Sequence, residues 1–534
     1  MGGLRPPMPP LQDHAGISRA QPLTSWLVSP ALIASSIIVL YLALCLALGL
    51  LSHSRLLPGS LEDFFLYGRR AKFLVLYLTI VSTYHSAFAF LGSVGYFYRH
   101  GIGFWAAGSW TILTGLLTWI LGGRAWALGK RFGYITPAEM AGDFYTSRTV
   151  RMAIATVSVL FTITYIQVQS LGLGYILSVA SGDRIPFALA CGVPLAVTAA
   201  YLLLGGVRAV YWTDVLQGVW MYVAVWTGGL FLAVYLFGGV GPLWDRVSLT
   251  RPELLTLPGP LGQFTYLHWF SLVVIFSFGV VLQPHFFLKF FTAESGRTLR
   301  RLGATTPIYL MTLYIPTAWV GLGAAVVRPG SNQPDALFPE LLLEHAPAWL
   351  AGFILAGAAA AAMSTLSGIL HANMTVLSRD LFQGYLRPQA SGAQAIRFGR
   401  WCVVLITVLG FVLTMVNPGF LVQLVAISGA GALQLLPAVL GNLFPRRIRF
   451  ARDGVLAGLA VGLATLCATL FGLGEWLAPH PLGLHAGLWG LIANATTVAA
   501  LSRAAARGPR AAVVESCLAE FADAREPLFD GEPK

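Results

Sequence analysis

The stretch AAAAAMSTLSGIL, Ala358–Leu370, places hydroxyl side chains, among them Ser364 and Thr365, in the middle of a long apolar run. A hydroxyl inside an apolar helix needs a hydrogen-bond partner, because burying it unpaired costs free energy. On a helix, Ala361, Ser364, Thr365 and Gly368 share one face through their i, i+3 and i+4 spacing. The stretch therefore predicts a polar face on an apolar helix, and the role of that face depends on the rest of the chain.

The composition is that of a polytopic membrane protein. Of 534 residues, 56% are hydrophobic and only 10% are charged, whereas a soluble domain carries about 25% charged residues. One membrane-crossing helix needs about 20 apolar residues. We therefore predict an all-α fold with about thirteen transmembrane helices, at residues 31–52, 73–98, 104–123, 152–180, 185–204, 214–239, 264–288, 305–327, 347–378, 400–416, 419–444, 453–474 and 484–502.

The basic residues predict how the chain is oriented. With the N-terminus outside and the C-terminus cytoplasmic, 27 of the 34 Lys and Arg residues, Arg208 and Lys289 among them, fall on cytoplasmic segments. This bias follows the positive-inside rule. The net charge of +12 thus reflects a multi-pass protein of the cell membrane, and we expect no nucleic-acid partner.

We expect one membrane domain with two tails. Residues 1–30 are rich in proline and predict a disordered extracytoplasmic tail, 31–502 form the membrane domain, and 503–534 form a cytoplasmic tail that is also expected to be disordered. The second tail is too short for a kinase or nucleotide-binding domain, and no GxxxxGK[ST] pattern occurs. Without GxSxG or HExxH patterns either, we predict neither an enzyme nor a cofactor.

Two five-helix halves, 73–239 and 264–444, have the parity of an inverted repeat, which recurs in secondary transporters. The first helix of each half is interrupted at a corresponding place. Residues 79–88 read TIVSTYHSAF, and Pro284 breaks the run FSFGVVLQPH. Non-helical backbone at membrane depth is tolerated only where it lines a cavity or is buried in protein. A solute site near the midplane, between these two helices, is therefore predicted.

Two interpretations of the hydroxyl face follow from the residues. The hydroxyls of Ser364 and Thr365, with a nearby carbonyl, form half of a site for a hard monovalent cation, and an unwound helix would supply the other oxygens. Alternatively, both hydroxyls bond back to their own helix and allow close packing.

Four motifs together resemble the sodium:solute symporter family. They are EDFFLYGRR at 62–70, LGGVRAVYWTDVLQG at 204–218, QPHFFLKFFTAES at 283–295 and AGAAAAAMSTLSGILHANMTVLSRDLF at 356–382. The resemblance implies a five-plus-five inverted-repeat (LeuT-type) core. It implies a role for Asp214 in ion release to the cytoplasm; the alternatives are a helix-dipole contact or a pair with Arg208. It also implies a sodium site made by the carbonyls of Ser82, His85 and Ala361 and the hydroxyls of Ser364 and Thr365.

The candidates for solute binding are neutral and partly aromatic, which suits a small polar solute such as a monocarboxylate, an amino acid or a similar nutrient. For Gln283, capping of groups freed by Pro284 is the alternative; for Tyr165 and Gln169 it is helix–helix bonding. The candidates are Tyr84, Ser86, Phe88, Tyr165, Gln169, Ser277, Gln283 and His285.

We predict a sodium-coupled symporter that works by alternating access in the lipid bilayer, with the small solute and the sodium ion as its partners. Tyr84 departs from the family pattern, since many relatives have Asp or Asn there, and His85 can titrate near neutral pH. A proton-coupled carrier of the same fold that uses His85 is therefore one alternative. A solute-sensing receptor that acts through a separate protein partner is another.

Overall fold

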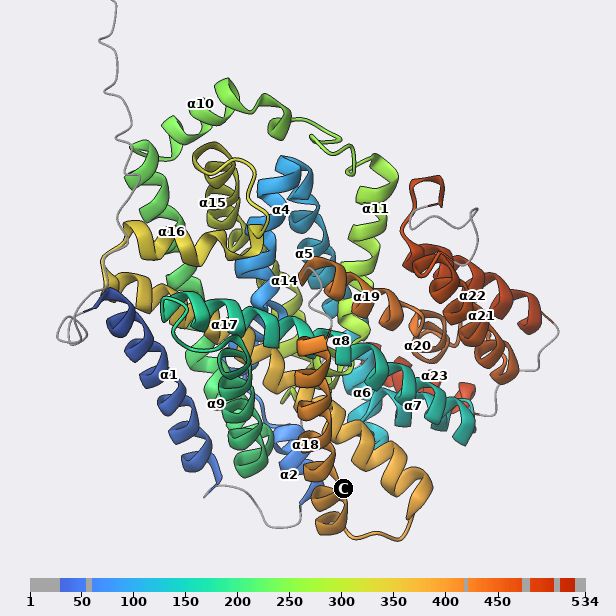
Figure 1. Ribbon diagram of the computed structural model, residues 1–534. Helices are drawn as coiled ribbons and strands as arrows, with labels where there is room; N and C mark the ends of the chain where they lie inside the picture. The colour runs from blue at the N-terminus through green and yellow to red at the C-terminus, as the bar shows by residue number, and fades with distance from the viewer. Residues whose placement is uncertain (1–28, 54–59, 417–420, 473–480, 504–509, 524–534) are drawn as a thin grey trace, which may run out of the picture.

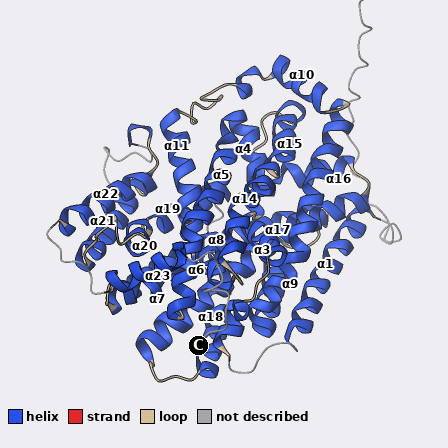
Figure 2. Ribbon diagram, turned by 180° about the vertical axis from the view of Figure 1, so that it is seen from behind, coloured by secondary structure: helices blue, strands red, loops and turns tan. Residues whose placement is uncertain are grey.

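The computed structural model describes residues 29–53, 60–416, 421–472, 481–503 and 510–523. Within these ranges all regular structure is helical, apart from one isolated bridge between Ala71 and Ala293 (Figure 2). The predicted disordered tail, 1–30, lies outside the described residues except for its last two positions. The all-α prediction is confirmed.

Apolar helices dominate the described part of the chain. Eight are long and apolar enough to cross a membrane, and ten if each of two bent pairs counts as one span. This confirms the multi-pass class, and the figure of thirteen crossings stays a prediction. Of the apolar helices among the described residues, α1 (Pro30–His53) precedes the two halves, and α21 (Arg452–Leu470) and α22 (Ala486–Ser502) follow them.

The first half begins with a broken helix. Its elements are α3 (Phe73–Tyr84), the π-helical η3 (Phe88–Gly92) with α4 (Ser93–His100), α5 (Ala106–Leu117) with α6 (Gly123–Phe132), α8 (Arg148–Ala180) and α9 (Phe187–Phe237). The second half repeats the scheme with α11 (Tyr266–Val274), the π-helical η7 (Ile275–Gly279), α12 (Val280–Leu282), α13 (Pro284–Thr292), α14 (Gly296–Thr312) with α15 (Tyr314–Val327), α17 (Ala348–Val376), α18 (Gly392–Val416), and α19 (Leu421–Leu433) with α20 (Leu436–Leu443).

Both predicted interruptions are present. Helix α3 ends at Tyr84, and His85 is extended, with φ −88° and ψ 112°. In the second half Gln283 is extended, with φ −62° and ψ 140°, and Pro284 opens α13. The spans on either side of Gln283 are bent by 52°. Proline suits this position because the first turn of a helix does not need its backbone N–H.

A glycine divides the 51-residue α9 into the two segments that the sequence predicts, 185–204 and 214–239. Gly206 has φ +56° and ψ −147°, a conformation that side-chain-bearing residues rarely adopt. A Cβ atom at this position would also lie 2.9 Å from the Phe64 ring. The break therefore requires glycine for two independent reasons.

Helix α17, which carries the stretch 358–370, is the central helix of the bundle (Figure 1). Its most apolar 18-residue window is 94% buried, and it packs against α1, α3, α8, α9, α13 and α18. A glycine permits the close contact with α9, since a Cβ atom at Gly357 would overlap the side chain of Ala224. The predicted polar face is thus enclosed by protein rather than lipid.

The prediction that the tail after 502 is disordered is wrong for residues 511–523, which form α23 (Ala511–Asp523). Val514, Cys517 and Leu518 are buried. The Phe521 ring lies 6.0 Å from that of Trp126 on α6. The sequence did not predict this helix because its apolar face is short and is flanked by charged and small residues.

Candidate ion and solute site

Two hydroxyls of α17 meet the end of the broken helix α3. The Ser364 hydroxyl lies 2.8 Å from the carbonyl oxygen of Ser82 and 3.0 Å from that of Ala361. The Thr365 hydroxyl lies 2.9 Å from the carbonyl oxygen of Thr83. Each hydroxyl therefore reaches across to the other helix.

The His85 carbonyl belongs to the same group, because its oxygen lies 3.3 Å from the Thr365 hydroxyl. We call this group the oxygen cluster: the carbonyls of Ser82, Thr83, His85 and Ala361 with the hydroxyls of Ser364 and Thr365. All six residues are fully buried. The structure thus brings together all five residues predicted for the ion site, Ser82, His85, Ala361, Ser364 and Thr365, and adds Thr83.

The oxygen cluster has the chemistry of a site for a monovalent cation. The break at His85 ends the helical hydrogen-bond ladder, so the carbonyls of the last turn of α3 have no continuing helix to bond. Carbonyl and hydroxyl oxygens can replace the hydration shell of such an ion without adding charge of their own. Both hydroxyls also contact the Ala361 carbonyl of their own helix. The alternative interpretation, in which they bond back to α17, therefore accounts for some of their hydrogen bonds.

A buried ion pair lies beside the oxygen cluster. The Lys289 ammonium is 2.5 Å from the Thr83 hydroxyl, 2.9 Å from the Thr79 carbonyl and 3.5 Å from the Asp214 carboxylate. The Thr83 hydroxyl also lies 3.4 Å from Asp214. Asp214 is fully buried and Lys289 is 4% exposed. This group joins both broken helices to α9.

The structure shows the surroundings of two charged residues. Lys289 does not belong to an exposed loop, because α13 carries it into the protein interior after the turn at Gln283; its side of the membrane stays a prediction. Asp214 does not pair with Arg208, whose guanidinium binds Asp63 at 2.5 Å instead. The carboxylate of Asp214 faces Lys289 and Thr83.

Several predicted solute residues surround the first break. The Gln169 side-chain oxygen accepts the Ala87 N–H at 3.1 Å, so the side chain holds the unwound backbone. The Tyr165 ring lies 5.7 Å from the His285 ring on α13. The Tyr84 hydroxyl is 3.4 Å from that of Thr114. These contacts join the two broken helices to α5 and α8.

Other candidates bond locally or to another helix. Ser277 donates to the Val273 carbonyl of its own turn at 2.5 Å, and Ser86 accepts the Phe88 N–H at 3.2 Å. Gln283 donates its amide to the Ser428 hydroxyl on α19 at 2.8 Å. Next to this bond the backbones of η7 and α19 approach so closely that a Cβ atom at Gly279 would overlap the Gly429 carbonyl.

An aromatic layer covers the break on the side toward the far end of α4. Phe88 stacks on Phe276 with ring centroids 5.9 Å apart, and Phe104 lies 6.0 Å from Phe88. Tyr314 lies 6.2 Å from Phe104 and 5.4 Å from His85. We define the aromatic layer as Phe88, Phe104, Trp110, Phe264, Phe276 and Tyr314.

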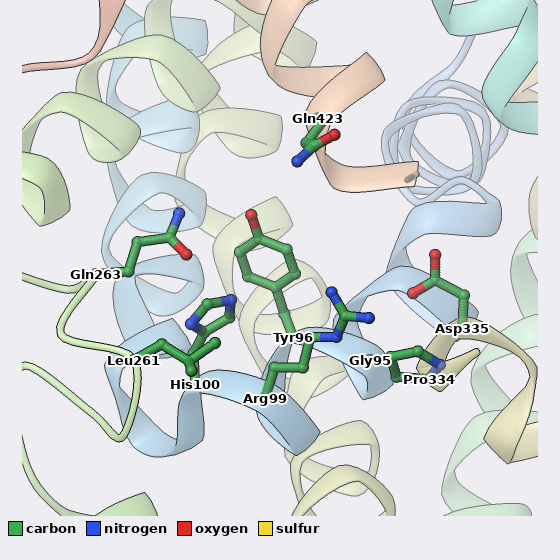
Figure 3. A pocket seen from close by; sticks show the side chains of 9 residues that line it. All are labelled: Gly95, Tyr96, Arg99, His100, Leu261, Gln263, Pro334, Asp335 and Gln423. Carbon is green, nitrogen blue, oxygen red and sulfur yellow. The ribbon is translucent and has the colours of Figure 1, made fainter. Parts of the chain in front are cut away.

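A charged pocket lies on the opposite side of this layer. Its cavity of about 170 Å³ is lined by Gly95, Tyr96, Arg99, His100, Leu261, Gln263, Pro334, Asp335 and Gln423. Two lining rings contact the layer: Tyr96 lies 5.1 Å from Phe104 and His100 lies 5.5 Å from Phe264. Figure 3 shows the Arg99 guanidinium between the Tyr96 ring and the Asp335 carboxylate.

The sequence analysis missed three features of the site. Thr83 was overlooked between two predicted ligands, although it lies in the same polar run. Lys289 carried a usable signal, because one lysine within FFLKFF is not the sequence of an exposed loop. Arg99 and Asp335 are distant in sequence, and no local pattern joins them.

Comparisons with known proteins find symporters of similar sequence. An uncharacterized symporter, YhjB of Bacillus subtilis, is 24% identical over 83% of this chain and 91% of its own length. The sodium/pantothenate symporter of Haemophilus influenzae is 25% identical over 80% of this chain and 88% of its own length.

The fold is shared with a solved sodium-coupled sialic acid symporter, seen substrate-bound and outward-open. The TM-score is 0.75 at 16% identity, over 89% of this chain and 98% of that one. This confirms the predicted LeuT-type fold class. The sequence model of the sodium:solute symporter family matches residues 64–462, and the chain therefore belongs to that family.

Proposed function

We propose that the chain takes up a small carboxylate-bearing nutrient together with sodium, by alternating access between the two broken helices. The observation that carries this proposal is the oxygen cluster, in which hydroxyls of α17 meet carbonyls of α3 and of His85 at 2.8–3.3 Å. Sodium bound there would tie the broken helix to the central helix. Ion occupancy would thereby steady the break and favour solute binding.

The ion ligands in this proposal are the carbonyls of Ser82, His85 and Ala361 and the hydroxyls of Ser364 and Thr365. The Thr83 carbonyl is a further candidate, because it lies closer to the Thr365 hydroxyl than the His85 carbonyl does. Asp214 would act on the route of ion release to the cytoplasm. Its place next to Thr83 supports this role.

Packing favours sodium over a proton carried by His85. The His85 ring lies among the rings of Tyr84, Tyr309 and Tyr314, at centroid distances of 5.4–5.9 Å. A proton carrier inside the membrane is expected to face a charged partner or water. The carbonyl of His85 points to the oxygen cluster, whereas its ring fills an aromatic pocket.

The solute would bind at the first break, against Tyr84, Ser86, Phe88, Tyr165, Gln169, Gln283 and His285, with Ser277 nearby on η7. We propose that it arrives through the charged pocket of Figure 3 and passes the aromatic layer. Arg99 suits a carboxylate, since guanidinium groups bind carboxylates with two parallel hydrogen bonds. Pantothenate and sialic acid, named in two of the similar proteins, both carry a carboxylate.

The orientation in this proposal has the N-terminus and the charged pocket outside and Asp214 and Lys289 toward the cytoplasm. The positive-inside bias of the sequence supports it.

The test is uptake into proteoliposomes that contain the purified full chain. A panel of labelled carboxylates, amino acids and neutral sugars is offered with an inward sodium gradient, an inward proton gradient or neither. We expect accumulation of at least one carboxylate only with the sodium gradient. Accumulation driven by protons alone would favour the proton-coupled alternative, and binding without transport would favour the receptor.

A further inference from the structure

Lys289 sits where a second cation would bind. Its ammonium has three N–H donors, and the structure provides three acceptors within 3.5 Å: the Thr79 carbonyl, the Thr83 hydroxyl and the Asp214 carboxylate. This is the full complement of an ammonium ion. Lys289 thus acts as a covalently attached cation inside the membrane domain.

The oxygens that hold Lys289 resemble a cation site in their own right. They come from α3 and α9, and they include a carboxylate. Three more buried oxygens nearby have no hydrogen-bond partner among the described residues: Asp214 Oδ1, Thr79 Oγ1 and Gln217 Oε1, which lies one turn from Asp214. Without the lysine, a buried carboxylate and these oxygens would lack a counter-ion, which is costly in a membrane protein.

Thr83 connects this group to the oxygen cluster. Its hydroxyl accepts the Lys289 ammonium, while its carbonyl accepts the Thr365 hydroxyl. The Lys289 ammonium and a sodium ion in the oxygen cluster would therefore lie on two sides of one residue, Thr83. A third charge, from a second mobile ion at Asp214, would meet repulsion from both and would add a net positive charge to a fully buried group.

We infer that Lys289 replaces a second coupling ion, so that the protein binds a single sodium ion in each transport cycle. Asp214 is neutralised within the chain, and sodium binds only at the oxygen cluster. Removing the lysine charge converts the Asp214 group into a vacant cation site, which recruits a second sodium ion. This inference rests on the proposed sodium site.

The experiment counts bound ions directly. Radioactive sodium-22 binding to purified full-length protein in detergent is measured to saturation, without any solute. We expect one ion per chain for the wild type, two for Lys289→Gln, one for Lys289→Arg, which keeps the charge, and one for the double variant Lys289→Gln with Asp214→Asn. Monodispersity and thermal melting establish that each variant is folded.

The possible outcomes separate the two proposals. Two ions in the wild type, or one in a folded Lys289→Gln variant, overturns the inference and leaves the oxygen cluster in place. No binding to the wild type overturns the sodium site itself. If Lys289→Gln does not fold, Lys289→Met serves as the uncharged variant of similar length, and the wild-type count alone still decides between one ion and two.

Discussion

Thr365 on α17 donates its hydroxyl to the Thr83 carbonyl of α3 at 2.9 Å, although the two residues are 282 positions apart. The Ser364 hydroxyl makes the equivalent contact with Ser82 at 2.8 Å, over the same separation. Two consecutive hydroxyls thus donate hydrogen bonds to two consecutive carbonyls at the end of α3. A shift of α3 by one residue would break both contacts together.

Replacing Ser364 and Thr365 together by alanine should weaken sodium stimulation of uptake tenfold or more. Each lost ligand removes about 1.5–3 kcal/mol, the scale of a hydrogen bond to a charged group. The measurement is the sodium concentration for half-maximal uptake. Ser367→Ala is the matched control, because this hydroxyl lies outside the oxygen cluster and donates to the Ser364 carbonyl of its own helix. Unchanged sodium dependence in the double variant would show that the two hydroxyls serve helix packing and do not bind sodium.

His85→Gln should leave sodium-driven accumulation largely intact. The ion contact comes from the backbone carbonyl, which the substitution keeps. Because the ring packs among three tyrosines, solute affinity and thermal stability are expected to fall modestly. The assay compares gradient-driven accumulation with solute exchange. Lost accumulation with preserved exchange, in a protein that sodium does not stimulate, would contradict sodium coupling.

Gly206→Ala should destabilise the fold by about 1–3 kcal/mol, the cost of a strained backbone conformation. The φ of +56° excludes most side chains, and the new Cβ atom would crowd Phe64. Thermal melting in detergent measures the effect. Gly241→Ala is the control, because a Cβ atom there meets nothing within 4 Å. Equal melting temperatures for the two variants would show that the break in α9 tolerates a side chain.

External pH should change the affinity for an anionic solute. Burial raises the pKa of Asp335 to about 6, against the opposing effects of the Leu421 backbone N–H and of Arg99. Above pH 6 the ionised carboxylate competes for Arg99; below it, the protonated form leaves the guanidinium to the solute. The KM for a carboxylate solute should therefore fall roughly two- to fivefold as external pH drops from 7.5 to 5, the scale of a partly exposed ion pair.

Asp335→Asn should remove this pH dependence and keep the low KM at every pH in that range. Asp245→Asn is the control, since Asp245 is an exposed acid on α10 (Val240–Thr250), outside the pocket. The same pH dependence of KM in the wild type and in Asp335→Asn would contradict the proposal that the solute passes through the charged pocket.

Local sequence patterns were enough to predict most of the fold. Apolar runs predict helices because lipid leaves few alternatives. Pro284 marks its break through a missing N–H. The break at His85 has no proline, and only the polar run and the repeat pointed to it. The ion ligands came from a family motif, whereas the partner of Asp214 could not be found locally: Lys289 lies 75 positions away, and its burial depends on how α13 turns.

The close approach of Gly279 to Gly429 has a mechanical consequence. Together with the Gln283–Ser428 hydrogen bond, it fastens α19 to the second broken helix on both sides of α12. A tilt of α19 should therefore move Gln283 by a similar amount, because the two are held together at both contacts. Helix α19 and the residues that precede the break in the second half should accordingly travel as one body when the protein changes from one open side to the other.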